Sequence, residues 1–403
     1  MTLFHEIFYQ CVSIKQVGAG ILAIPAVTRD AGFLASAVTC IICWIFMVVT
    51  GLLIAEVNVN TMRELGSGGV SLVSMTMRTL GNTGVQVACW SYVFIHYALL
   101  VAYVARSSDI LTNFLGIPLS ANKFRSFCVI AQQTKESGFK SKLESSSGLI
   151  EFKESSSSFI IKEENSSFEI ASGDLDWNEL LKSNFEAVPR SIPIIALSFV
   201  YQNVVPVLCT NLEGNLSKVR TAIVSGTAIP LALFLVWNAV ILGTMTIPEI
   251  GSNISADPLQ QLRSTNGVVG PIVDTFSLLA IATSYVGFVL GLADFLADLL
   301  KRPSGSNEPL QYILILIPPL IMALLDPEVF FKALDFAGTY GVLVLFGILP
   351  AAMSWVDRGS AQSKSSRFQT LVPGGNFTLS LVIGAAALVI LTELLDDLGF
   401  AWK

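Results

Sequence analysis

Two apolar stretches of the chain carry residue types that interrupt a helix and free backbone groups for binding. One contains Gly18, Gly20 and Pro25, and the other contains Gln202 and Asn203 shortly before a proline. Glycine loosens a helix because it lacks a Cβ atom, and proline removes a hydrogen-bond donor. Freed amides can hold a carboxylate, and freed carbonyls can hold a cation or an ammonium group. Paired interruptions in two halves of a membrane bundle predict a substrate site near its midplane.

Each interruption also has a purely structural interpretation. Gly18 and Gly20 could serve only to let two helices pack closely, and Pro206 could be a simple kink. Together, in a chain so poor in charge, the two motifs favour a transport site.

Three ionisable residues in apolar surroundings are candidates for carrying a proton. His96 lies inside an apolar stretch, where an ionisable group is a functional candidate, or a neutral imidazole bonded to a neighbouring helix. Glu56 and Asp294 end two other stretches and are either proton carriers or helix-end partners of Arg63 and Lys301. For these two carboxylates the structural role is the preferred interpretation.

The sequence gives little support for a catalytic, metal or cofactor site. The chain has no H-E-x-x-H or G-x-S-x-G motif, so no catalytic residue is assigned and an enzyme is not expected. Two histidines in the whole chain leave little for a metal site, and no cofactor is expected. The pair Cys40 and Cys43 lies in an apolar stretch, where a thiol behaves as a small hydrophobic group.

The composition places these motifs in a membrane protein. Of 403 residues, 53% are hydrophobic and 13% are charged, and the mean hydropathy is +0.66. Soluble domains have about 25% charged residues, so this chain requires the bilayer as a second solvent. The net charge of −6 argues against a nucleic-acid partner, which would need a basic surface.

The charge-poor stretches have the length of membrane-spanning helices, about 20 residues each. We predict nine spans, at 7–27, 33–55, 84–105, 191–212, 221–248, 275–293, 309–325, 336–356 and 377–392. Only helices satisfy their own backbone in lipid at this length, so the predicted fold is an all-α polytopic bundle in a lipid bilayer. Lys and Arg gather in the loops after the second, fourth, sixth and eighth of these spans, which predicts the cytoplasmic side.

One region does not fit a membrane bundle. Residues 106–190 form a polar insert with serine clusters at 145–147 and 155–158, and we predict disorder over about 126–175. The expected organisation is therefore membrane helices over 1–105, the insert over 106–190, and further membrane helices over 191–403.

Several segments resemble the tryptophan/tyrosine permeases, which are aromatic amino acid permeases of the amino acid–polyamine–organocation superfamily. The resembling segments are 18–33 (GAGILAIPAVTRDAGF), 52–57 (LLIAEV), 97–103 (YALLVAY), 198–206 (SFVYQNVVP), 214–237 (GNLSKVRTAIVSGTAIPLALFLVW) and 282–299 (ATSYVGFVLGLADFLADL). The resemblance implies a leucine-transporter type inverted repeat with broken helices. It also implies secondary transport of tyrosine or tryptophan by alternating access, coupled to protons. The amino-acid sequence of these segments is most similar to plant or algal members of the family, which suggests that the protein lies in the plastid envelope.

The resemblance also assigns site residues. Those implied at the substrate are Gly18, Ala19 and Gly20 in the first broken helix, Phe199, Tyr201 and Asn203 in the second, and Tyr97, Thr283 and Ser284 in facing helices. The last three are placed there by geometry alone.

The chain departs from the family pattern in its first half. The polar insert stands where the family has its fourth and fifth helices, so the first repeat is expected to lack two helices. The alternative function is therefore that of a truncated or mis-spliced, transport-deficient paralogue that acts only as a membrane protein.

Overall fold

A computed structural model describes residues 17–66, 70–115, 180–181, 183–244, 269–299, 309–326, 329–361 and 370–399. Over these ranges the chain is helical and contains no strand. Most of the polar insert (116–179 and 182, including the predicted disordered stretch 126–175), the predicted cytoplasmic Lys301 and part of the first predicted span lie outside the described residues.

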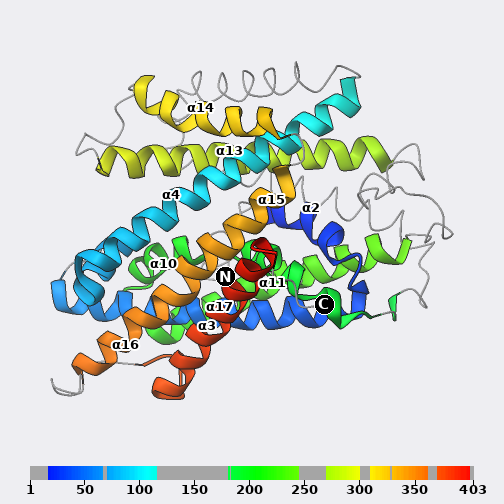
Figure 1. The fold of residues 1–403 in the computed structure, drawn as a ribbon. Coiled ribbons are helices and arrows are strands. Elements are labelled where there is room, and N and C mark those ends of the chain that lie inside the picture. The colour runs from blue at the N-terminus through cyan, green and yellow to red at the C-terminus, as the bar shows by residue number, and fades with distance from the viewer. Residues whose placement is uncertain are drawn as a thin grey trace.

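The helices form one bundle (Figure 1). In chain order they are α2 (Val17–Thr28), α3 (Gly32–Leu65), α4 (Leu72–Leu115), α9 (Ile192–Ser198), α10 (Val205–Asn211), α11 (Leu216–Thr244), α13 (Val269–Leu299), α14 (Pro309–Leu325), α15 (Val329–Phe336), the π-helix η5 (Ala337–Ile348), α16 (Leu349–Ala361) and α17 (Gly375–Asp397). Short 3₁₀ turns lie at Phe185–Ala187 (η2), Pro189–Ser191 (η3) and Gln202–Val204 (η4).

The predicted polytopic all-α fold is confirmed. Within the described ranges, six helical segments are long and apolar enough to cross a membrane: Gly32–Leu65, Leu72–Thr112, Pro189–Asn211, Leu216–Gly243, Val329–Gly359 and Gly375–Asp397. The stretches Ser277–Ala293 and Gln311–Leu325 are shorter apolar helices at two further predicted spans.

Two long helices organise the core. α3 packs against α9, α10, α11 and α16, while α4 runs diagonally away from it and contacts α13, α14, α15, η5 and α16 (Figure 1). α17 lies at the edge and exposes large apolar side chains such as Phe377, Leu381 and Leu388. The interior available for a site therefore lies between α4, α13 and the shorter helices α2 and α9.

α4 differs from the predicted span at both of its ends. A kink at Gly81, where φ is +67°, joins a short helical segment to the membrane-spanning part. The helix also continues past the predicted end at residue 105, through Arg106, to Leu115. Arg106 is buried, and its guanidinium lies over the ring of Phe330, 5.3 Å from the centroid.

Gly338, in the first turn of η5, provides a test of this packing. A Cβ atom there would collide with the backbone carbonyl of Pro193 in α9, which cannot rotate away. We expect Gly338→Ala to lower the free energy of unfolding by about 1–3 kcal/mol, seen as a lower melting temperature of the purified protein in detergent. The control is Gly384→Ala in α17, where a Cβ would meet nothing within 4 Å. A Gly338→Ala protein that melts at or above the temperature of this control would contradict the packing.

Candidate functional site

The second predicted interruption is present between α9 and α10. α9 ends at Ser198, and the backbone leaves helical geometry at Tyr201, with φ −134° and ψ −4°. The 3₁₀ turn η4 follows, and α10 begins with Pro206 in its first turn, where a missing donor breaks no helical hydrogen bond. The residues 199–204 are called the break below.

Polar side chains fasten the break to α3. The hydroxyl of Tyr201 donates to the carbonyl of Met47 at 3.0 Å, and the amide of Gln202 donates to the hydroxyl of Thr50 at 3.2 Å. The Gln202 side chain also accepts from the Tyr201 backbone N–H at 2.9 Å. Gly51 admits the Tyr201 ring, because a Cβ there would collide with the Tyr201 hydroxyl. Gln202 therefore positions the break.

The first predicted interruption differs from expectation. Gly18, Ala19, Gly20 and Pro25 all lie within the helix α2, with no interruption from Val17 to Thr28. A proline inside a helix removes one hydrogen bond, and here the helix continues through it. Gly20 instead allows close contact with α9, since a Cβ there would lie 3.2 Å from the Cα of Ser198 and closer still to its side chain.

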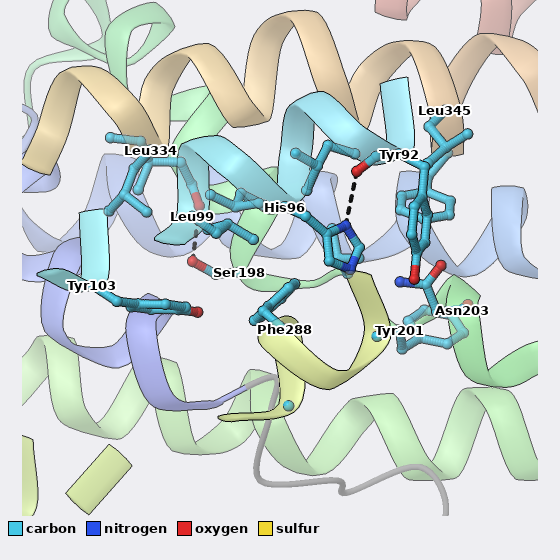
Figure 2. Close-up of a pocket in the computed structure, with 18 of the residues that line it drawn as sticks. Tyr92, His96, Leu99, Tyr103, Ser198, Tyr201, Asn203, Phe288, Leu334 and Leu345 are labelled. Atoms are coloured by element: carbon cyan, nitrogen blue, oxygen red, sulfur yellow. Dashed lines mark hydrogen bonds between the residues drawn. The ribbon is translucent and has the colours of Figure 1, made fainter. Parts of the chain in front are cut away.

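A cavity of about 290 Å³ lies between these elements (Figure 2). Its walls come from α2, α4, α9, the break, α13, α15 and η5, and most of its lining side chains are apolar. Small-molecule sites typically measure about 300–1,000 Å³, so this cavity is at the lower end of that range. Gly20 and Ser198 both line it, so the two motifs found in the sequence share one cavity.

A row of aromatic rings forms the wall between α4 and α13. The ring centroids of Phe295 and Tyr92 are 4.8 Å apart, those of Tyr92 and His96 are 4.0 Å apart, and those of His96 and Phe288 are 5.1 Å apart. Tyr103 continues the row, 5.8 Å from Phe288. All except Phe295 line the cavity.

Apart from His96, the residues of this wall were not predicted from the sequence as part of the site. The sequence did contain a pattern that could have indicated this wall, because residues 92, 96, 99 and 103 recur at the spacing of one helix face. In such apolar surroundings, however, the same spacing is equally typical of a helix face that only packs in the core.

His96 has a defined tautomer when its ring is neutral. Its Nδ1 lies 2.8 Å from the backbone carbonyl oxygen of Tyr92, and a carbonyl can only accept, so Nδ1 carries the hydrogen. The Nε2 atom of the neutral ring is then a hydrogen-bond acceptor. The side chain is buried and lines the cavity (Figure 2).

The cavity gathers some of the predicted site residues. Gly20, Tyr201, Asn203 and His96 all line it, from three different parts of the chain. Asn203 is the exposed residue of this group.

Other predicted residues point elsewhere. Tyr97 donates from its hydroxyl to the carbonyl of Leu314 in α14 at 2.8 Å, and Phe199 packs edge-on against Phe234, 5.3 Å away. Ser284 is fully buried in α13 but does not line the cavity. The side chains of Ala19, Thr283 and Asp294 lie outside the described residues, although α2 and α13 include their positions.

Glu56 lies in a buried ion pair outside the cavity lining. Its carboxylate accepts from Arg358 Nε at 2.7 Å and from Arg358 Nη2 at 2.8 Å, and also from the Leu371 backbone N–H at 2.9 Å. The expected helix-end pairing with Arg63 is therefore wrong for Glu56. Its partner is Arg358 on α16, and the structural interpretation of this residue fits its contacts.

A second ion pair lies next to the first on α16. Asp357 approaches Arg78 of α4 at 2.6 Å and accepts from the amide of Asn60 at 2.8 Å. Arg78 also reaches Glu64 at 2.9 Å, so the segment of α4 before Gly81 is tied to both α3 and α16.

Comparison with known proteins places this architecture among transporters. The model of the tryptophan/tyrosine permease family matches residues 11–393. The tyrosine-specific transport system 2 of Haemophilus influenzae is 29% identical, over 95% of this chain and 94% of its own length. The tryptophan-specific transport protein of the same organism is 25% identical, over 95% and 94%. The low affinity tryptophan permease of Escherichia coli is 25% identical, over 96% and 95%.

These matches are to permeases and transport proteins, so the prediction of a transporter and not an enzyme is confirmed. The family match includes the broken helix α9–α10, the aromatic wall of α4 and the residues of α2 that meet at the cavity. The chain belongs to the tryptophan/tyrosine permease family.

Proposed function

We propose that this protein is a secondary active transporter that moves tyrosine or tryptophan across a lipid bilayer by alternating access. The observation that carries the proposal is the cavity that the break and the aromatic wall share. The break offers non-helical backbone and the amide of Asn203, and α4 and α13 offer a row of aromatic rings. An aromatic amino acid has the same two parts, a zwitterion and a ring.

The zwitterion is assigned to the side of the cavity formed by α2 and the break. The carbonyl end of α9 favours an ammonium group, because the last carbonyls of a helix carry partial negative charge. The carboxylate stays a prediction for the backbone of Gly18, Ala19 and Gly20, of which Gly20 lines the cavity together with Asn203. Tyr201 is a wall residue, while Thr283 and Ser284 stay predictions. Tyr97 and Phe199 are left out because they contact Leu314 and Phe234.

The proposal also includes coupling to protons and a location in a particular membrane. Because Glu56 is held by Arg358, the role of proton carrier stays a prediction for His96 and Asp294. A histidine changes its charge near neutral pH, which suits a group that must bind and release protons. The leucine-transporter type inverted repeat and the plastid envelope also stay predictions. A fluorescent fusion expressed in plant or algal cells would test the latter.

The test is uptake by the purified full chain in proteoliposomes. We expect accumulation of radiolabelled tyrosine or tryptophan when the lumen is made alkaline, and loss of accumulation when a protonophore collapses the gradient. Liposomes without protein are the control. A folded protein that binds these amino acids but accumulates neither would instead support the alternative of a transport-deficient paralogue.

A further inference from the structure

Two buried ion pairs join three helices at the end of the bundle that the sequence predicts to be cytoplasmic. Glu56 of α3 approaches Arg358 of α16 at 2.7 Å, and Asp357 of α16 approaches Arg78 of α4 at 2.6 Å. The neighbours Asp357 and Arg358 therefore carry opposite charges to two different helices. These four residues, two acids and two bases, are called the charge cluster below. The parts of α3, α4 and α16 that carry it lie on the left in Figure 1.

The helices that carry the charge cluster also reach the cavity. In α3, Met47 accepts from the break, and Glu56 follows about two and a half turns further on. In the continuous helix of η5 and α16, Phe346 lines the cavity, and the charge cluster lies nearer the other end. Ser354 lies between them, fully buried, with its hydroxyl 3.5 Å from the carbonyl oxygen of Leu53. α3 and α16 are therefore in contact between the cavity and the charge cluster.

The part of α4 in the charge cluster is a separate helical segment. Gly81, with φ +67° and ψ −158°, divides residues 72–80 from the rest of α4. Among the described residues, a Cβ built on Gly81 would meet nothing within 4 Å, so packing does not wedge this kink. Arg78 also donates from Nε to the hydroxyl of Thr61 at 2.8 Å. Arg78 is therefore the charged link from this segment to both α3 and α16.

The charge cluster has the properties of a contact that can open to water. A buried ion pair adds little net stability, because desolvation of the charges offsets their attraction. The Oδ1 atoms of Asn58 and Asn60 in α3 are buried and accept no hydrogen bond from the residues that the structure describes. Entry of water would hydrate these atoms and weaken the attraction between the charges, which is far smaller in water than in a dry interior. The contact is thus strong when dry and weak when wet.

We propose that the charge cluster is a latch that closes the cytoplasmic end of the transport route. While both ion pairs are formed, α16 is bound to α3 and to the segment 72–80. When α16 moves away, the two pairs part together and water enters between the helices. This inference rests on the proposed transport by alternating access, in which the two ends of the route must open in turn.

The experiment measures how fast a cysteine introduced at Ser354 reacts with a charged maleimide. The substitution Ser354→Cys puts a thiol of similar size at a fully buried position next to the latch. The reaction is followed by mass spectrometry on the purified full chain in detergent, and the chain without this substitution gives the background. Adding Arg78→Gln should speed the labelling about tenfold, because the loss of one charge-assisted hydrogen bond changes an equilibrium constant by about that factor.

A second variant keeps the proposal testable if Arg78→Gln does not fold. Asp357→Asn removes the other charge of the same pair, keeps the shape of the side chain, and should also speed the labelling about tenfold. Glu64→Ala is the matched control, because Glu64 pairs with the same guanidinium at 2.9 Å but is 52% exposed. It should leave the labelling rate unchanged. The native Cys40 and Cys43, buried in the opposite half of α3, report on general loosening and should stay unlabelled in every variant.

The outcomes separate the latch from the proposed function, because labelling does not depend on uptake. A wild-type chain that takes up neither tyrosine nor tryptophan overturns the transport proposal, and the latch with it. If the wild type transports but a folded Arg78→Gln or Asp357→Asn protein labels no faster than Glu64→Ala, the charge cluster only packs. Faster labelling of Cys40 and Cys43 together with the introduced cysteine would show unfolding and would also overturn the latch.

Discussion

Replacing Gly20 with alanine is expected to reduce tyrosine or tryptophan uptake by about a hundredfold, one of the two largest effects that the structure predicts. The added Cβ would collide with the side chain of Ser198 and lie 3.2 Å from its Cα atom. α2 and α9 would have to separate at the place where both line the cavity. A displacement of about 1 Å at a binding site is enough to cost about a hundredfold in rate.

The measurement is the initial rate of uptake in proteoliposomes, with size-exclusion profile and melting temperature as folding checks. Adding Ser198→Gly to Gly20→Ala removes the Cβ and hydroxyl that the new methyl meets, and should restore part of the uptake. Gly384→Ala, where a Cβ meets nothing within 4 Å, should transport as the wild type does. Wild-type uptake by Gly20→Ala would show that the contact with Ser198 is not needed.

Replacing Glu56 with alanine is expected to destabilise the protein by about 3–5 kcal/mol, the typical cost of removing one partner of a buried ion pair. Glu56 is fully buried and receives two hydrogen bonds from Arg358 and one from the backbone of Leu371. Without it, the Arg358 guanidinium stays largely buried, with 13% of its side chain exposed and no counter-charge from Glu56. The melting temperature in detergent, or the yield of monodisperse protein, measures the loss.

Two controls distinguish a stranded charge from lost packing. The double variant Glu56→Leu/Arg358→Met removes both charges and should be more stable than Glu56→Ala, because apolar pairs often replace buried ion pairs at little cost. Glu64→Ala removes an acid of which 52% is exposed, and should change stability by less than about 1 kcal/mol. A Glu56→Ala protein as stable as Glu64→Ala would contradict the importance of the buried pair.

The membrane architecture could be predicted from the sequence because one local property determines it. Hydrocarbon thickness requires about 20 apolar residues per span, and the charge-poor stretches of α3, α11 and α17 show this directly. The break could be predicted for a similar reason, since Gln202, Asn203 and Pro206 follow one another in an apolar segment. Polar groups and a proline within such a segment indicate a helix that cannot continue unchanged.

The ends and interruptions of a helix were harder to predict where a residue contacts another helix of the bundle. Arg106 indicated the end of a span, yet α4 passes through it, and its guanidinium packs against the ring of Phe330 in α15. The glycines of α2 indicated an interruption, yet Gly20 is used for close contact with Ser198. In both cases the deciding neighbour lies far away in the sequence.

The sequence by itself determined the all-α membrane fold class and the position of the break, because hydropathy, proline and polar residues act locally along the chain. Only the tertiary structure decided which side chains meet. His96 lines the cavity while its neighbour Tyr97 faces α14, because successive residues of a helix point in different directions and packing sets the rotation. Glu56 and Arg358 pair across 302 residues, a contact that follows from the fold alone.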